Sequence, residues 1–174
     1  MSWYLLVPLI LVAVIAVVLL AGSMIEKDHK ATSTIELKAT PAEVWATLTD
    51  WRQFQTWRKD LKAIEAFSAP DGKTGWVETS DWGRMPLVIE QADAERLFVG
   101  RIADDSLPFG GTWTHRLEAL PGGGTRLSST EDGFIKPAFF RLMAKMVFGY
   151  HKTLNDYQRA LAGKFGESVT PVNS

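Results

Sequence analysis

An uncharged, apolar run near the N-terminus constrains this chain more than any other feature of its sequence. Residues 3–22, WYLLVPLILVAVIAVVLLAG, contain no charged side chain. As a helix rising about 1.5 Å per residue, they would span about 30 Å, the thickness of the hydrocarbon core of a bilayer. Trp3 and Tyr4 stand at one end of the run, where amphipathic rings favour the headgroup layer. The run therefore predicts a transmembrane anchor over residues 1–23.

A cleaved signal peptide is the competing interpretation of the same run. Such peptides have a basic n-region, a shorter apolar stretch and a small-residue cleavage site. No Lys or Arg precedes the run, although the segment AGS at 21–23 resembles a cleavage site. We expect a permanent single-pass anchor in the cell membrane, which contacts membrane lipids through residues 3–22. Lys27 and Lys30 follow it, and this bias of positive charge predicts a cytoplasmic location for the rest of the chain.

The rest of the chain has the length of one ordinary domain with a core of its own. All 19 basic and 20 acidic residues follow the apolar run, and the net charge of −1 argues against a nucleic-acid-binding protein. The lack of cysteine excludes a thiol nucleophile. We expect a linker over 24–30, the domain over 31–163, and a polar tail over 164–174 with a frayed end.

The region around Thr40 predicts a strand followed by two short helices. Residues 31–38 alternate in polarity, which favours a strand. Thr40 then acts as an N-cap before Pro41, and Glu43 completes a capping box. A second short helical piece is expected over 51–58.

Three of the seven Trp residues recur at six-residue intervals in this region. Residues six apart on one helix are separated by about 600°, so Trp45 and Trp51 cannot share a stripe and belong to separate pieces. Trp45 is expected in the core. For Trp57 the sequence leaves two equal alternatives, a position in the core or a position in the wall of a pocket. Contact with a membrane is a third alternative.

The middle of the chain predicts an antiparallel meander. Strand-like segments are separated by short turn signals, as consecutive hairpins require. PGGGT at 121–125 joins two strands and opens no helix, so it indicates a hairpin turn rather than a phosphate loop. The expected strands are 61–67, 74–80, 86–91, 95–102, 112–120 and 125–133.

One long helix is predicted from Pro137 to about Gly163. Gly149 interrupts its interior, where a bend or a close contact is expected. A helix with a single apolar stripe must cover a partner, and the sheet is the large one available. The stripe recurs at alternating steps of four and three and consists of Met143, Val147, Tyr150, Leu154, Tyr157 and Leu161.

Four segments of this pattern resemble the START/polyketide-cyclase-like superfamily (SRPBCC). They are TPAEVWATLTDWRQFQTW, LPFGGTWTHRLEAL, GGGTRLSSTEDG and FFRLMAKMVFGYHKTLNDYQRAL. The resemblance covers residues 31–163 and implies an α+β helix-grip fold, in which a curved antiparallel sheet of about six to seven strands surrounds the last helix. The superfamily includes lipid carriers, hormone-binding proteins, cyclases and oxygenase subunits, so the fold alone does not define an activity.

The cavity that the resemblance implies between sheet and helix is the expected ligand site. Strand alternation places His115 on the interior face, and Glu131 on the next strand likewise. These two side chains would orient the polar end of a ligand. Alternatively they form a buried polar pair bonded to each other or to water, or they perform acid–base catalysis. The full expected lining is Trp57, Leu87, Ile89, Trp113, His115, Glu131, Met143, Val147 and Tyr150.

We therefore expect a membrane-anchored binding or transfer module for a hydrophobic small molecule such as a lipid, quinone, isoprenoid or polyketide-like compound. An accessory subunit of a larger membrane protein complex is the alternative, and a cyclase or dehydratase is a further one. No G-x-S-x-G, H-E-x-x-H or P-loop signature is present, and no catalytic residue is assigned. The three His residues lack ligand spacing, so no metal and no cofactor are expected.

Overall fold

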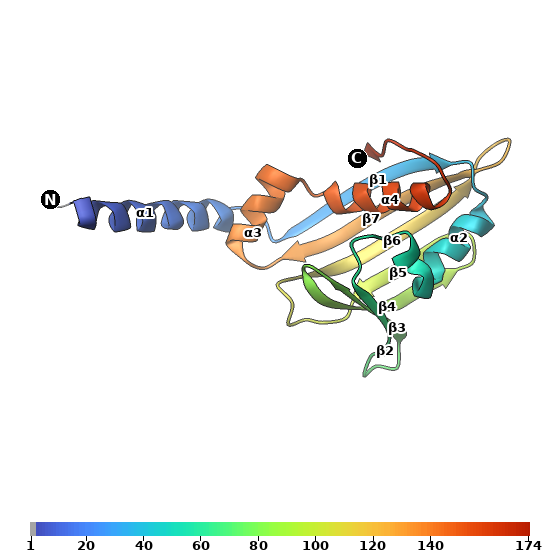
Figure 1. Cartoon of the computed structure of the whole chain (residues 1–174), viewed down its shortest axis with the longest axis horizontal. Helices are drawn as coiled ribbons and strands as arrows, with labels where there is room; N and C mark the ends of the chain where they lie inside the picture. Colours follow the sequence, from blue (N-terminus) through green and yellow to red (C-terminus); the bar gives the residue numbers. More distant parts are fainter. Residues whose placement is uncertain (1–2) are drawn as a thin grey trace.

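The chain folds into one long N-terminal helix and an α+β body, and the computed structural model describes residues 3–174 (Figure 1). One antiparallel sheet contains eight strands in the order β2-β3-β4-β5-β6-β7-β1-β8. The strands are β1 (Asp28–Leu37), β2 (Ala63–Ser68), β3 (Thr74–Ser80), β4 (Gly83–Asp93), β5 (Leu97–Ile102), β6 (Phe109–Ala119), β7 (Thr125–Ile135) and β8 (Val172–Asn173). The helices are α1 (Trp3–Ser23), α2 (Pro41–Thr49), the 3-10 helix η1 (Trp51–Thr56), α3 (Ala138–Met143), the π-helical η2 (Ala144–Phe148) and α4 (Lys152–Lys164). The predicted α+β meander is confirmed, with each predicted strand in its expected order.

The capping box predicted before α2 is present. The Thr40 backbone N–H donates to Glu43 Oε2 at 2.8 Å, and the Glu43 N–H donates to Thr40 Oγ1 at 3.4 Å. Two N–H groups at the helix start are thereby satisfied within the segment itself. The helix buries Val44 and Leu48 in the core.

The three regularly spaced Trp residues lie on successive pieces of the chain. Trp45 belongs to α2 and meets the Phe98 ring edge-on, with the ring centroids 6.2 Å apart. Trp51 begins η1 and stacks on Trp76 at 6.3 Å. Trp57 follows η1 and is 6% exposed within the core cluster. The prediction that they belong to separate pieces is therefore confirmed.

The PGGGT segment is a hairpin turn, as predicted. The Gly123 N–H donates to the Leu120 carbonyl at 3.0 Å, and the Leu120 N–H donates to the Gly124 carbonyl at 3.1 Å. All three glycines have φ between 86° and 103°, which side chains with a Cβ rarely adopt. The turn joins β6 to β7 and is not followed by a helix.

The prediction of one continuous helix over 137–163 is wrong. Helix α3 passes into the π-helical η2, and Gly149 then ends this segment with φ 73° and ψ 148°. A bend at Gly149 was expected, and the backbone here leaves the helical region altogether. Of these three pieces, α4 lies along the sheet, against β1 and β7, whereas α3 packs mainly against α1 (Figure 1). The apolar stripe therefore holds from Leu154 to Leu161, whereas Val147, before Gly149, is exposed.

The polar tail does not fray. Val172 and Asn173 form β8 and pair with β1 opposite Thr34 and Ser33. The Ser33 hydroxyl donates to Asn173 Oδ1 at 2.7 Å. An unpaired edge of β1 supplies the hydrogen-bond partners, which the sequence of the tail by itself does not reveal.

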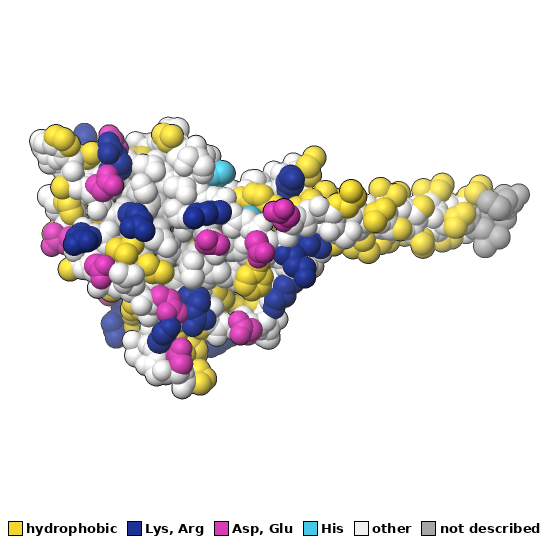
Figure 2. Space-filling view, turned by 180° about the vertical axis from the view of Figure 1, so that it is seen from behind, with side chains coloured by type: hydrophobic (Ala, Val, Ile, Leu, Met, Phe, Trp, Pro, Cys, Tyr) yellow, Lys and Arg dark blue, Asp and Glu magenta, His cyan; other side chains and the backbone are white. Residues whose placement is uncertain are grey.

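Helix α1 extends away from the body, and hydrophobic side chains cover its surface (Figure 2). It is long and apolar enough to cross a membrane, and a signal sequence near an N-terminus can meet the same criteria of length and composition. Most of its large apolar side chains are exposed, for example Val12 at 63%. In water such a surface would be unfavourable, so α1 needs an apolar partner outside the body.

Candidate functional site

Aromatic rings fill the space between α4 and the concave face of the sheet. Tyr157 of α4 lies at the centre: its ring centroid is 5.5 Å from those of Trp57 and Trp113 and 5.3 Å from that of His115. Rings at these separations are in favourable edge-to-face or stacked contact. Three residues expected to line a ligand cavity therefore pack against the helix directly.

His115 belongs to a buried polar network on this face. Its Nδ1 lies 2.9 Å from Ser129 Oγ, and the Gln158 amide of α4 donates to the same oxygen at 3.1 Å. Gln158 also donates to the Ser33 carbonyl at 2.7 Å. Burial lowers the pKa of His115 from 6.5 to about 4, so the imidazole is neutral at neutral pH. The network pairs the imidazole, the Ser129 hydroxyl and the Gln158 amide N–H groups, and ties α4 to β1 and β7, while Gln158 Oε1 has no partner within residues 3–174.

Glu131 does not pair with His115. The strand register places His115 opposite Ser129, and Glu131 lies two residues further along β7, opposite Trp113. Its Oε1 lies 3.4 Å from His29 Nε2. The hypothesis of a His115–Glu131 pair is therefore wrong, because each side chain has a different partner.

His29 is absent from the predicted site because residues 24–30 are predicted as a linker. In the structure β1 begins at Asp28, and alternate residues from His29 to Leu37 face the interior. Extending the predicted strand from residue 31 back to Asp28 would have placed His29 on the same face as the core residues of β1. Its side chain is 8% exposed.

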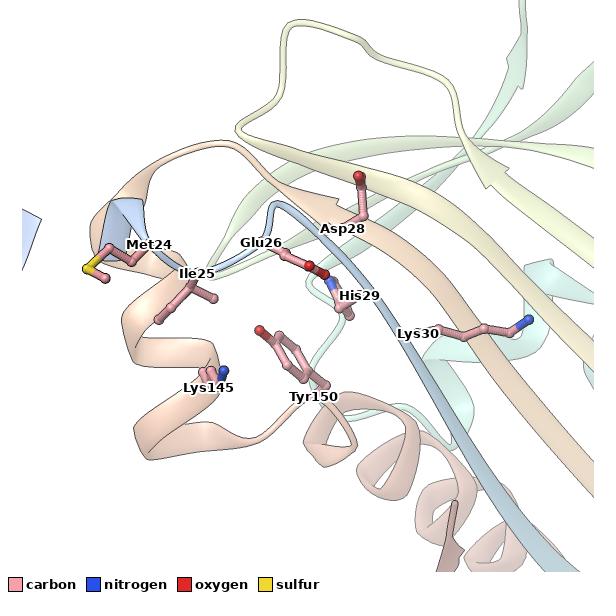
Figure 3. A pocket seen from close by; sticks show the side chains of 8 residues that line it. All are labelled: Met24, Ile25, Glu26, Asp28, His29, Lys30, Lys145 and Tyr150. Atoms are coloured by element: carbon pink, nitrogen blue, oxygen red, sulfur yellow. The ribbon is translucent and has the colours of Figure 1, made fainter. Parts of the chain in front are cut away.

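A hollow of about 490 Å³ opens beside His29, between the start of β1 and the segment before α4 (Figure 3). The Tyr150 ring stacks on the imidazole with the ring centroids 4.5 Å apart. The Nδ1 atom of His29 is buried and has no hydrogen-bond partner within residues 3–174. The hollow thus lies beside a histidine that has one ring nitrogen without a partner. The lining residues are Met24, Ile25, Glu26, Asp28, His29, Lys30, Lys145 and Tyr150.

Residues that pair across neighbouring strands form one row on the concave face. The row begins with the apolar Ile89 and reaches the carboxylate of Glu131. Successive pairs join Ile89 to Gly100, Gly100 to Trp113, Trp113 to Glu131, and Glu131 to Ala31. Gly100 is buried, yet a Cβ built on it would meet one heavy atom within 4 Å, the Val88 carbonyl oxygen at 3.9 Å. Ile89 and Trp113 on either side are half-buried. There is thus room for a methyl group over Gly100, bordered by apolar side chains.

The other expected site residues lie around this row or away from it. Leu87 pairs with Ile102 next to the row and is half-buried. Trp57 lines a second hollow of about 380 Å³ between η1 and α4. Met143 and Val147 lie on α3 and η2, off the sheet, and Val147 is 61% exposed. Within residues 3–174 no cluster of three or more His, Asp or Glu could hold a metal ion.

A curved antiparallel sheet that holds a C-terminal helix, with two short helices after the first strand, defines a helix-grip protein. The chain belongs to the family described as polyketide cyclase / dehydrase and lipid transport, which matches residues 28–162. The resemblance to the START/SRPBCC superfamily is thereby confirmed.

Solved structures share the same fold. A START superfamily protein from Mycobacterium smegmatis has a TM-score of 0.62 at 16% identity, over 78% of this chain and 96% of that chain. The Zhui aromatase/cyclase from Streptomyces sp. R1128 has a TM-score of 0.64 at 14% identity, over 79% and 93%. Norcoclaurine synthase from Thalictrum flavum, in complex with dopamine and hydroxybenzaldehyde, has a TM-score of 0.61 at 13% identity, over 84% and 90%. The curated proteins gave no match.

Proposed function

We propose that this protein is a membrane-anchored module that binds or transfers a hydrophobic small molecule, such as a lipid, quinone, isoprenoid or polyketide-like compound. The family description names lipid transport beside polyketide cyclases and dehydrases. Helix α1 is long enough to hold the body at a bilayer, where such compounds dissolve. The fold fits a hydrophobic ligand between a sheet and a helix.

The observation that carries the proposal is the room over Gly100 within the row from Ile89 to Glu131. Apolar ligand atoms over Gly100 would contact Ile89 and Trp113 and leave water. A polar group at the other end of the ligand would reach Glu131, whose neighbour His29 has an unused nitrogen. The row therefore suits an amphiphile with an extended apolar part and one hydrogen-bonding head.

Substitution of Gly100 tests this site. Gly100→Leu would fill the space over the row, whereas Val99→Leu adds one methylene to the opposite face of the same strand. The full chain, purified in mild detergent, is analysed by native mass spectrometry, and any bound compound is extracted and identified. We expect the wild type and Val99→Leu to carry the same hydrophobic compound and Gly100→Leu to lose it. Equal occupancy in both variants would contradict the site, and a bare wild-type chain after incubation with membrane lipids would contradict the function.

The rings around Tyr157 favour a second candidate, an accessory subunit of a membrane protein complex. Three aromatic contacts occupy the interior under α4, where a ligand would otherwise lie. A body with a packed interior would act through its surface and its anchor. Stoichiometric partners that co-purify with a ligand-free chain would support this function, and a clean ligand-bearing monomer would exclude it.

For the topology we propose a single-pass anchor with the body in the cytoplasm, because Lys27 and Lys30 follow α1. The chain lacks cysteine, so Ser168→Cys creates one exposed thiol on the body. A membrane-impermeant maleimide should label it only after the cells are permeabilised. Labelling of intact cells would place the body on the other side.

A further inference from the structure

Five large apolar side chains project from the short segment before α4. They occur within ten consecutive residues of α3 and η2 and are 45–70% exposed. The buried side chain of this segment, Arg141, lies on its other side. Exposed aromatic and aliphatic groups in such a concentration indicate an interaction surface. They are Phe139, Phe140, Met146, Val147 and Phe148.

This apolar segment is held at the body end of α1. A Cβ built on Gly22 would lie 2.1 Å from the Ala138 carbonyl oxygen, so the two backbones are in close contact. Arg141 Nη1 donates to the Ile25 carbonyl at 3.0 Å. Helices α1 and α3 are thus in contact (Figure 1), and the exposed apolar side chains of the segment lie next to the apolar surface of α1.

The segment itself carries charges of one sign, while Glu26 and Asp28 line the hollow beside it together with Lys145. Residues 133–155 contain Lys136, Arg141, Lys145 and Lys152 and no Asp or Glu. Where α1 meets the body, Lys and Arg side chains lie together with acidic ones (Figure 2). Apolar side chains flanked by Lys are the pattern of a helix that lies in the interface of an anionic bilayer.

We propose that α3 and η2 form a second membrane contact, lying in the headgroup layer of an anionic bilayer beside α1. Phe139, Phe140 and Phe148 enter the boundary with the acyl chains, and Lys145 faces the lipid phosphates. The turn at Gly149 allows this, because it directs the segment off the sheet toward α1. The hollow beside His29 and Tyr150 then opens at the depth of the headgroups, where an amphiphilic ligand presents its polar end. The inference rests on the proposed membrane anchoring by α1.

Fluorescent labels on single cysteines measure the depth of each segment. Val147→Cys reports on the segment, Ala13→Cys on the middle of α1, and Trp82→Cys on an exposed apolar position of the hairpin between β3 and β4. Each full-length variant carries the dye NBD and is placed in nanodiscs of phosphatidylcholine with phosphatidylglycerol. We expect a blue-shifted emission and protection from iodide at positions 147 and 13, and neither at 82.

The labels at positions 13, 82 and 147 distinguish a failure of the second membrane contact from a failure of the anchor. A water-exposed label at 147 beside a protected label at 13 would overturn the second contact and leave the anchor intact. A water-exposed label at 13 would contradict the anchor itself. Nanodiscs of phosphatidylcholine alone should weaken the protection at 147 and leave position 13 unchanged, because the lysines then lose their anionic partners. Equal protection at 147 in both bilayers would remove the role assigned to Lys145.

Discussion

Arg141 Nη1 donates a 3.0 Å hydrogen bond to the backbone carbonyl of Ile25, 116 residues earlier in the chain. The bond joins the first turns of α3 to the segment that leads from α1 into β1. Arg141 is 8% exposed, and no acidic side chain lies within salt-bridge distance of it in residues 3–174. The Nη1 bond of this buried guanidinium to a backbone carbonyl helps to fix the position of α3 at the end of α1, although its Nε has no partner within residues 3–174.

Arg141→Ala should loosen this junction without unfolding the body. Loss of a charge-assisted hydrogen bond, worth about 1.5–3 kcal/mol, predicts about ten- to hundredfold faster amide exchange in residues 138–148. Hydrogen–deuterium exchange of the full chain in detergent measures it. Arg159→Ala, on the exposed side of α4, is the matched control and should leave that region unchanged. Unaltered exchange in Arg141→Ala would show that packing against α1 suffices.

His115 should make the stability of the body depend on pH. Burial lowers its pKa to about 4 from 6.5, so the unfolded chain binds more protons between these values. The free energy of unfolding therefore rises with pH across that window and falls by at most about 3 kcal/mol on acidification from neutral pH to pH 4. His115→Gln should flatten this dependence in urea titrations. The control His151→Gln should retain it, and a retained slope in His115→Gln would assign it to other groups.

The ion pair of Arg58 and Glu78 should be the most sensitive electrostatic contact of the body. Arg58 Nη1 lies 2.6 Å from Glu78 Oε1, with the two side chains 13% and 5% exposed. Arg58→Met leaves a buried carboxylate with the Trp76 indole as its remaining donor, which should destabilise the body by about 3–5 kcal/mol. Urea unfolding followed by Trp fluorescence measures the loss.

Lys62 provides the control for this prediction. It pairs with Asp81 at the surface, with the two side chains 60% and 86% exposed. Lys62→Met should change the stability by less than about 0.5 kcal/mol. Equal effects of the two substitutions would mean that Glu78 reaches water or protonates when Arg58 is removed.

Gly149→Ala should destabilise the chain, although the added methyl group meets no neighbour within 4 Å. The conformation at φ 73° and ψ 148° is strained for any residue with a Cβ, at a cost of about 1–3 kcal/mol. Gly163→Ala also points into open space but lies in a regular helix, where Ala stabilises by up to about 1 kcal/mol. Urea unfolding of both variants should therefore give shifts of opposite sign. A stable Gly149→Ala variant would indicate that the chain can form the continuous helix instead.

Local features of this protein could be predicted from its sequence. The Thr40 capping box, the three-glycine turn before β7 and the alternation of each predicted strand depend on residues close together in the chain. The apolar run of α1 likewise depends on composition alone. Together with the resemblance, these features were sufficient for the helix-grip fold.

Other features were decided only by the tertiary structure. Glu131 meets His29 rather than His115 because of the strand register, and the tail pairs with β1 because an edge is free. A glycine at position 149 is compatible with a bend in a helix or with the end of one. The helix ends there in the structure, where α3 packs against α1. The free energy of each outcome comes from contacts between residues distant in sequence, which no local pattern encodes. The sequence by itself determined α1, α2 and the strands β1 to β7 with their order, and long-range packing determined the break at Gly149, the pairing of β8, which polar groups meet and which apolar surface stays exposed.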